Sequence, residues 1–222
     1  MHINIKNYTK KIGKEEVLKN INICLESGKI YGLKGKNGSG KTMLMRAISG
    51  LMSATEGEID IDGKILGKDM SFPKSIGLLL ESPSFLPQYS GIDNLKMIAS
   101  IKGIVGEDEI KDVIRRVGLD PEDKKKYKKY SLGMKQKLGI ACAVMENPQI
   151  IILDEPVNAV DEDGIKIIRE ILDDLKKKDK IIIIACHDKE ELFFLSDTII
   201  EIANGKIVKE YEVKNTNNLS DE

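Results

Sequence analysis

The stretch that decides the fold of this sequence is Gly35-Lys36-Asn37-Gly38-Ser39-Gly40-Lys41-Thr42. It matches the phosphate-loop pattern, in which a glycine, four further residues and a second glycine precede lysine and a serine or threonine. Small residues let backbone N–H groups close around phosphate oxygens, and the N-terminus of a following helix adds partial positive charge. We expect Lys41 to reach the outer phosphates of a nucleoside triphosphate and Thr42 to offer its hydroxyl to Mg²⁺. A plain strand–turn–helix corner is the alternative, which the motif and its context disfavour.

The flanking segments have the structure that this chemistry requires. Lys29–Lys34 is typical of a short strand, and Lys41–Leu51 of a helix. Elsewhere strand-like and helix-like stretches alternate, which predicts an α/β fold with parallel strands. The other expected strands are His2–Asn7, Asn20–Glu26, Glu58–Asp62, Ser75–Leu80, Ile150–Leu153, Lys180–Cys186, Thr198–Ala203 and Lys206–Val213, and the other expected helices are Glu107–Gly118, Met134–Met145 and Gly164–Lys177.

A second stretch places carboxylates where a metal ion is expected. Ile150-Ile151-Ile152-Leu153-Asp154-Glu155 is an apolar run that ends in two acids. A buried strand of an open α/β sheet delivers its last residues to the crevice where ligands bind. We therefore expect Asp154 to hold Mg²⁺, directly or through water, and Glu155 to polarise the attacking water. Alone, the pattern also fits a polar strand end; the phosphate loop upstream favours the metal site.

A histidine follows the next apolar strand. His187 comes directly after Ile181–Cys186, where a γ-phosphate can be contacted. A lone histidine is also compatible with a packed or solvated side chain, but the two preceding motifs favour catalysis or phosphate sensing. His2, beside the N-terminus, receives no role.

Composition argues against several classes of protein. The 222 residues carry 35 Lys and Arg against 36 Asp and Glu, a net charge of −1, with 41% apolar and 32% charged residues. This balance argues against a dedicated nucleic-acid-binding protein, so no nucleic-acid partner is expected. The charged block Asp123–Lys129 is interpreted as a solvated loop, with a nucleic-acid or lipid patch as the alternative.

Membrane spans and metal-binding cysteine patterns are not found. No apolar run approaches the roughly 18–20 residues that cross a bilayer, and the first residues lack a signal-peptide core, so any membrane role is expected to come through a partner. Cys24, Cys142 and Cys186 are scattered and odd in number, as in a cytosolic protein with reduced thiols. Without a Cys-x-x-Cys pair and with two histidines, no zinc site is expected.

The order and spacing of these motifs resemble the ATP-binding cassette (ABC) family over nearly the whole chain. The segment Tyr130-Ser131-Leu132-Gly133-Met134-Lys135-Gln136 is similar to the family signature, usually Leu-Ser-Gly-Gly-Gln, and Ser131 is placed to cap the following helix. The resemblance implies that Ser131 and Gly133 face the γ-phosphate of an ATP held by the opposite protomer. It also matches Asp161 to the family's D-loop aspartate, which communicates across that interface.

Two positions depart from the family pattern. Ile12 stands where an adenine-stacking aromatic residue is usual, and an aliphatic side chain loses a stacking energy of roughly 0.5–1.5 kcal/mol. Tyr8 is the alternative base contact. Glu81 stands where the family has its Q-loop glutamine, and Gln88 is a competing candidate for that position. We expect Glu81 to sense the metal ion through water and to transmit closure of the site to the helical subdomain. The Glu81-Ser82-Pro83 and signature variants are similar to the bacitracin and lantibiotic self-protection exporters.

The resemblance implies a P-loop NTPase (RecA-like) core with a small antiparallel β subdomain and a helical subdomain that carries the signature. On this hypothesis residues 1–222 form one cassette, with a core of about 1–83 and 148–213, a helical subdomain of about 84–147 and a polar tail, 214–222.

The implied function is that of the subunit of an ABC transporter, an exporter, that binds and hydrolyses Mg-ATP. It would form a dimer with a second copy of itself or with a related ATPase subunit. ATP-driven closure of this dimer would power a separate transmembrane subunit at the inner face of the cell membrane. Two alternatives stay open: a soluble ABC ATPase of translation or DNA repair, and a P-loop nucleotide kinase. The single cassette without sustained heptads and the four arginines disfavour them.

Overall fold

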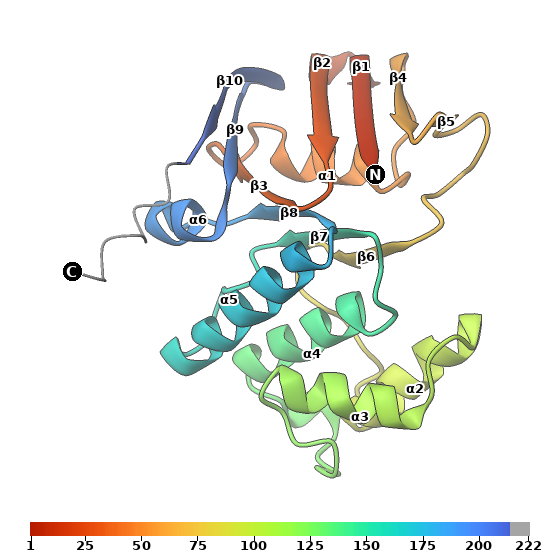
Figure 1. Ribbon diagram of the computed structural model, residues 1–222, viewed down its shortest axis with the longest axis vertical. Coiled ribbons are helices and arrows are strands. Elements are labelled where there is room, and N and C mark those ends of the chain that lie inside the picture. Colours follow the sequence, from red (N-terminus) through yellow and green to blue (C-terminus); the bar gives the residue numbers. More distant parts are fainter. Residues whose placement is uncertain (214–222) are drawn as a thin grey trace.

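Strands and helices alternate along the chain, of which the computed structural model describes residues 1–213 (Figure 1). The polar tail expected at 214–222 lies outside the described residues. The strands are β1 His2–Ile12, β2 Glu15–Glu26, β3 Lys29–Lys34, β4 Glu56–Ile61, β5 Lys64–Ile65, β6 Ile76–Leu79, β7 Ile150–Asp154, β8 Ile181–Ala185, β9 Thr198–Ala203 and β10 Lys206–Glu212. The helices are α1 Lys41–Ile48, α2 Gly91–Lys102, α3 Glu107–Arg116, α4 Leu132–Val144, α5 Glu162–Lys177 and α6 Lys189–Leu195, with a 3-10 turn, η1, at Tyr127–Lys129.

Two sheets form the frame of the molecule. One is antiparallel, in the order β2-β1-β4-β5, and the other has six strands in the order β10-β9-β3-β8-β7-β6. In the six-stranded sheet β9, β3, β8, β7 and β6 run parallel, while β10 pairs antiparallel with β9 at the edge. The expected α/β class, with parallel central strands and a small N-terminal antiparallel sheet, is confirmed.

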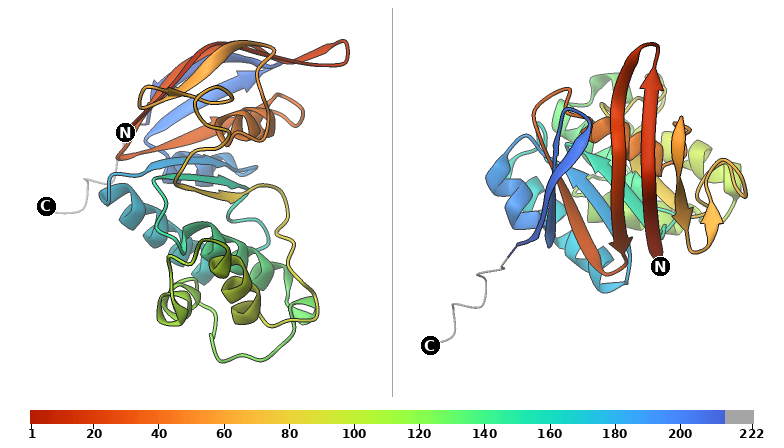
Figure 2. Two further views of the ribbon diagram at one scale, coloured as in Figure 1. Left: turned by 90° about the vertical axis from the view of Figure 1, so that its right-hand side faces the viewer. Right: turned by 90° about the horizontal axis from the view of Figure 1, so that it is seen from above.

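The central strands are buried on both faces, which explains their unbroken apolar sequences. Because successive side chains point to opposite faces, Ile150 and Ile152 of β7 pack with α1 and the antiparallel sheet. Ile151 and Leu153 pack on the other face, with α4 and α5. The sheet therefore separates two hydrophobic clusters, and the phosphate-loop helix α1 and the signature helix α4 lie on opposite faces (Figures 1 and 2).

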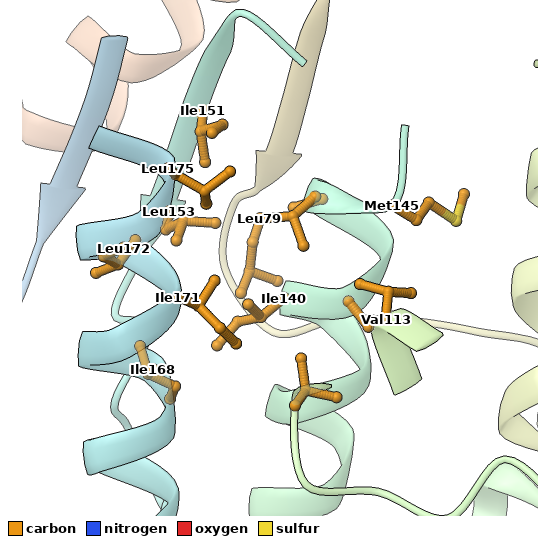
Figure 3. Packing of buried hydrophobic residues seen from close by; sticks show 14 of the residues in the cluster. Leu79, Val113, Ile140, Met145, Ile151, Leu153, Ile168, Ile171, Leu172 and Leu175 are labelled. Carbon is orange, nitrogen blue, oxygen red and sulfur yellow. The ribbon is translucent and has the colours of Figure 1, made fainter. Parts of the chain in front are cut away.

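Helix α4 packs closely onto the edge of the six-stranded sheet. Leu79 of β6, Ile140 of α4 and Ile171 of α5 meet in the cluster beneath the sheet (Figure 3). A Cβ atom on Gly77 of β6 would lie 1.7 Å from the carbonyl oxygen of Ala143, so this glycine lets strand and helix backbones touch. The position of the signature helix is thus set by backbone contact as well as by side-chain packing.

The segment between β6 and β7 is helical, and α2, α3 and α4 lie on the side of the six-stranded sheet away from the antiparallel sheet (Figure 2). Most of the charged block 123–129 is exposed around the buried ring of Tyr127, whose hydroxyl donates to the carbonyl of Pro83 at 2.6 Å. This agrees with a solvated loop. Within residues 1–213, no helix is both long enough and apolar enough to cross a bilayer.

The first two strands are longer than the sequence pattern predicts. The expected strands stop at Asn7 and begin at Asn20, but β1 and β2 continue past both residues. Asn7 and Asn20 have φ angles of 49° and 50°, and the β1–β2 register shifts nearby. Asparagine tolerates this left-handed conformation, so the two residues mark β-bulges within a hairpin rather than strand ends.

Candidate functional site

The phosphate loop connects β3 to α1, as its motif predicts. Helix α1 begins at Lys41 after Gly40, whose φ of 115° is strained for any residue with a side chain. The Lys41 ammonium is buried and donates to the carbonyl oxygens of Gly35 and Lys36, at 2.7 and 3.2 Å. The lysine thus spans the concave side of its own loop, where it is positioned to exchange carbonyl oxygens for phosphate oxygens.

A hollow of about 600 Å³ opens in front of the loop. Its floor is the start of α1, including Lys41 and Thr42, and its walls come from β2, from Glu81 and from the β9–β10 turn. Gly205 of that turn donates its N–H to the carbonyl of Ser39 at 2.9 Å and accepts from the N–H of Lys19 at 2.7 Å. The Asn-Gly hairpin turn therefore braces the phosphate loop against β2.

The two expected magnesium ligands lie together beneath the loop. Thr42 Oγ1 donates to Asp154 Oδ2 at 2.9 Å, and the Asp154 side chain is buried. A hydroxyl and a carboxylate are the hard oxygen donors that Mg²⁺ takes alongside phosphate oxygens and water. Ser39 Oγ is buried in the loop without a hydrogen-bond partner among the described residues, as expected where a phosphate oxygen is to be bound. These residues fit a Mg²⁺–triphosphate group.

Glu155 and His187 are brought together at the ends of β7 and β8. The backbone N–H of His187 donates to Glu155 Oε2 at 2.9 Å, and His187 Nε2 lies 3.6 Å from Glu155 Oε1. Burial raises the pKa of the Glu155 carboxyl above its ordinary value, against the opposing hydrogen bond and charge of His187. A carboxylate with a raised pKa is a stronger proton acceptor, which suits a general base. The His187 side chain is 66% exposed, so it faces the open side of the site.

The turn after β7 is strained where Glu155 sits. Glu155 has a φ of 55°, which is rare for a residue with a Cβ atom. Its backbone is held on two sides, because its N–H donates to Ala185 at 2.8 Å and its carbonyl accepts from Gln136 Nε2 at 2.7 Å. Gln136 lies on the signature helix, so α4 and the carboxylate turn of the same chain are joined by a partly buried hydrogen bond.

Glu81 lies at the rim of the hollow and forms an ion pair. Its Oε1 accepts from Arg46 Nη2 at 2.6 Å, and Arg46 lies on α1, one turn after Thr42. Glu81 also has a φ of 60°, so its backbone is strained in addition to its carboxylate being held in an ion pair. Gln88, the competing candidate, lies in a different hollow on the helical side of the chain.

The predicted base contacts are not brought equally close to the phosphate loop. Tyr8 is buried in the core and donates its hydroxyl to the carbonyl of Met52 at 2.7 Å, so its ring is unavailable for a base. Ile12 is 52% exposed beside the β1–β2 turn, but it is not among the residues that line the hollow. Val17, on β2, lines it instead.

Ser131 caps the signature helix as expected, although α4 begins at Leu132 rather than at the expected Met134. The helix lies on the opposite face of the sheet from α1. Ser131 Oγ accepts from the N–H of Met134 at 3.2 Å and caps the helix, and the residue is exposed. A Cβ atom on Gly133 would lie 2.8 Å from the carbonyl of Ala159, so the helix start approaches the segment before α5 closely. Asp161 caps α5 through the N–H of Gly164 and pairs with Lys137 at 3.1 Å.

Several residues of the site are not identified by the sequence motifs. Gln136, Arg46 and Gly205 each reach the site through a partner more than ten residues away. For Gln136, its place within the signature segment was a signal that it belongs to the site. For Arg46 and Gly205 the sequence gives no such signal, since an arginine in a helix and a glycine in a turn are common.

Comparison with known proteins agrees with this geometry. The family profile described as "ABC transporter" matches residues 18–158. The "Uncharacterized ABC transporter ATP-binding protein YybJ" of Bacillus subtilis (strain 168) is 50% identical over 205 residues, which cover 92% of this chain and 94% of that protein. The "Lantibiotic transport ATP-binding protein SrtF" of Streptococcus pyogenes is 38% identical over 220 residues, 99% and 94% of the two chains. The "Bacitracin transport ATP-binding protein BcrA" of Bacillus licheniformis is 39% identical over 210 residues, 94% of this chain and 69% of that protein.

A solved structure shows the same fold. "Dimeric Structure of MJ0796, a Bacterial ABC Transporter Cassette" superposes with a TM-score of 0.86 at 26% identity, and covers 96% of this chain and 99% of that one. The phosphate loop, the Asp154–Glu155 strand and the capped signature helix thus occur in the fold where they are expected, and the chain belongs to the ATP-binding subunits of the ABC transporter family, which are ATPases.

Proposed function

We propose that this chain is the ATPase subunit of an exporter that moves an antimicrobial peptide or a similar molecule out of the cell. The transport names of SrtF and BcrA support the substrate class. The working unit is two ATPase chains bound to a separate transmembrane subunit at the inner face of the cell membrane. Residues 1–222 form one cassette, with a core of about 1–83 and 148–213 and a helical subdomain of about 84–147.

The phosphate loop holds the triphosphate of ATP. The backbone N–H groups of residues 35–42 surround the phosphate oxygens, and Lys41 transfers its donors from the carbonyls of Gly35 and Lys36 to the outer phosphates. Thr42 and Asp154 hold Mg²⁺, which neutralises charge on the phosphate oxygens when bound. The base lies against the β1–β2 hairpin, where Ile12 and Val17 offer aliphatic surface.

Glu155 takes the proton of the attacking water. Its raised pKa and its place beside Asp154 support this role, and the N–H of His187 orients the accepting carboxylate. The exposed imidazole of His187 contacts the γ-phosphate. Glu81 approaches the metal through water, and its link to α1 through Arg46 connects the nucleotide with the segment that leads into the helical subdomain.

The observation that carries this proposal is the place of Ser131. It caps an exposed helix start that lies across the sheet from its own chain's phosphate loop, so it is available to another molecule. In a head-to-tail dimer Ser131 and Gly133 of each chain face the γ-phosphate bound by the other, as the family signature implies. Asp161, next to this helix start through Lys137, lies at the same interface. A γ-phosphate that touches both chains makes closure depend on ATP.

Size-exclusion chromatography with light scattering tests the proposal directly. Glu155→Gln with saturating Mg-ATP should elute as a dimer, and with Mg-ADP as a monomer. Adding Ser131→Arg should leave a monomer that still binds ATP, because a bulky cation then occupies the interface. Ser100→Arg on α2, an exposed serine away from this surface, is the matched control and should still dimerise. A monomer of Glu155→Gln at saturating Mg-ATP would contradict the proposal.

The phosphate-loop assignment has its own control. Lys41→Ala removes a buried ammonium whose charged hydrogen bonds are worth about 1.5–3 kcal/mol each, so ATP affinity should fall by at least about tenfold and the dimer should not form. Unchanged nucleotide affinity would remove Lys41 from the site.

A further inference from the structure

Three metal-binding side chains meet on the outer surface of the antiparallel sheet, away from the nucleotide site. Within the described residues, His2 of β1 and Cys24 and Glu26 of β2 bring an imidazole nitrogen, a thiol sulfur and a carboxylate oxygen within 4.8 Å of one another. All three residues are exposed. No role in ATP binding or hydrolysis involves them.

Strand register produces this cluster. His2 pairs directly with Glu26 across the β1–β2 ladder, and Cys24 lies two residues earlier on the same strand, so both β2 side chains point to the same face. The intervening Leu25 and the neighbouring Ile3 point inward and are buried. Because alternation fixes which face each residue takes, the three residues stay neighbours on this face as long as the strands remain paired.

The start of β1 is tied down on both sides. On one side the N–H of Ser27 donates to the carbonyl of Met1 at 3.0 Å. On the other, the N–H of His2 donates to Asp62 Oδ1 at 2.7 Å, and the N–H of Asp62 donates to the carbonyl of His2 at 3.2 Å. The backbone that carries the imidazole is therefore part of the sheet, with β2 and the end of β4 as neighbours (Figure 1).

We propose that His2, Cys24 and Glu26 form a binding site for one Zn²⁺ ion, with water as the fourth ligand. Nitrogen, sulfur and carboxylate oxygen are the donors that Zn²⁺ accepts in tetrahedral sites, with bonds of about 2.0–2.3 Å. Such bonds place the donor atoms about 3.3–3.8 Å apart, so the three atoms, which lie within 4.8 Å of one another, need to approach by at most about 1.5 Å through side-chain rotation. Binding releases the thiol proton of Cys24 to solvent and involves no redox step.

Competing contacts are weak. Glu26 Oε2 lies 3.6 Å from the Lys29 ammonium, and both side chains are about half exposed. An exposed ion pair at this distance contributes little to stability, so Zn²⁺ can displace the Lys29 ammonium from the Glu26 carboxylate. Neither the His2 imidazole nor the Cys24 thiol takes part in a hydrogen bond found among the described residues, so both are free to bind a metal ion.

The site lies at the far end of the hairpin from the nucleotide. The β1–β2 turn borders the hollow at Glu15 and Glu16, whereas the cluster is at the other end of strands of eleven and twelve residues, about 33 Å away. Zinc there joins β1 to β2 and stabilises the antiparallel sheet without touching the ATPase machinery. Its loss or gain is therefore expected to leave the basal ATPase rate unchanged.

Thiol chemistry offers a clean probe of this site, because Cys24 is the exposed cysteine of the three. Burial raises the pKa of Cys142 to about 11 and that of Cys186 well above its ordinary value, so neither reacts readily. For protein purified without a polyhistidine tag, Zn²⁺ should bind in a 1:1 ratio and slow the reaction of Cys24 with a thiol reagent by at least about tenfold. A chelator should restore the rate. Co²⁺ in place of Zn²⁺ should give a thiolate-to-metal absorption band.

Substitutions distinguish a specific site formed by these three residues from nonspecific metal binding elsewhere on the protein. Cys24→Ser should abolish the cobalt band and the rise in melting temperature with Zn²⁺. His2→Asn and Glu26→Gln should each weaken binding by at least about tenfold, since loss of a direct ligand costs no less than loss of an outer-shell partner. Cys142→Ser is the matched control and should bind as the parent does. Unprotected Cys24 at saturating Zn²⁺, or binding that persists in Cys24→Ser and His2→Asn, would overturn the proposal.

Discussion

Replacement of Glu155 by glutamine should change activity and stability in opposite directions. Glutamine keeps the shape of the side chain and an oxygen that accepts from the His187 N–H, so the turn after β7 should persist. It cannot take a proton from water. Removal of a general base slows the chemical step about 10²–10⁴-fold, which raises the barrier by about 2.7–5.4 kcal/mol. We therefore expect kcat for ATP hydrolysis to fall by this factor, with ATP affinity retained.

The stability effect follows from the raised pKa of Glu155. A carboxyl whose pKa is raised by folding stabilises the fold most when it is protonated, below the ordinary glutamate pKa, and this contribution is lost as the pH rises through the folded value. The parent protein should thus lose this contribution to its stability over this pH window, and Glu155→Gln should not. At neutral pH the variant should have the higher free energy of unfolding, and the difference should vanish in acid.

Two measurements decide this prediction. Steady-state phosphate release gives kcat, and urea unfolding at a series of pH values gives the free energy of unfolding. Asp163→Asn, at an exposed carboxylate in the first turn of α5, is the control for removal of a negative charge. A kcat within about threefold of the parent would refute the general-base role. A variant no more stable than the parent at neutral pH would refute the burial argument.

Three further predictions concern the other parts of the site and its frame. Glu81→Gln should cost at most about 1 kcal/mol of unfolding free energy, since its ion pair is exposed, yet it should change the Mg²⁺ dependence of the ATPase; unchanged dependence would exclude Glu81 from metal sensing. Gly77→Ala forces a Cβ atom into the backbone of α4 and should lower stability by about 1–3 kcal/mol, or about 2–12 °C in melting temperature. Asp161→Ala should lower the melting temperature because α5 loses its N-cap, whereas Asp161→Ser should retain the cap. If Asp161 acts only as a cap, Asp161→Ser added to Glu155→Gln will still form the dimer with Mg-ATP.

The parts of the site that depend on short segments could be predicted from the sequence. The phosphate loop, the Asp154–Glu155 strand end and the Ser131 cap each have a pattern within a few residues, because turn geometry, strand burial and helix capping are local requirements. The structure shows these elements where they were expected. Their chemical roles in binding and hydrolysis remain predictions for the experiments described above.

Other features depend on which strands and helices become neighbours. The pairing of Arg46 with Glu81, the hydrogen bond from Gln136 to Glu155 and the meeting of His2 with Cys24 join residues between 19 and 35 positions apart. The sequence pattern also ended the first strand at Asn7, where the pairing of β1 with both neighbours carries it on through a bulge.

The sequence by itself determined that this protein has a phosphate loop, a carboxylate pair at a strand end and a capped signature helix, because each of them depends on a few consecutive residues. The alternation of strand-like and helix-like segments determined the α/β class. The tertiary structure alone decided that the signature helix lies across the sheet from the phosphate loop, that Glu81 is paired with Arg46 and that an imidazole, a thiol and a carboxylate share one face of a hairpin. Strand order and register set these contacts, and they depend on how the whole chain buries its apolar surface.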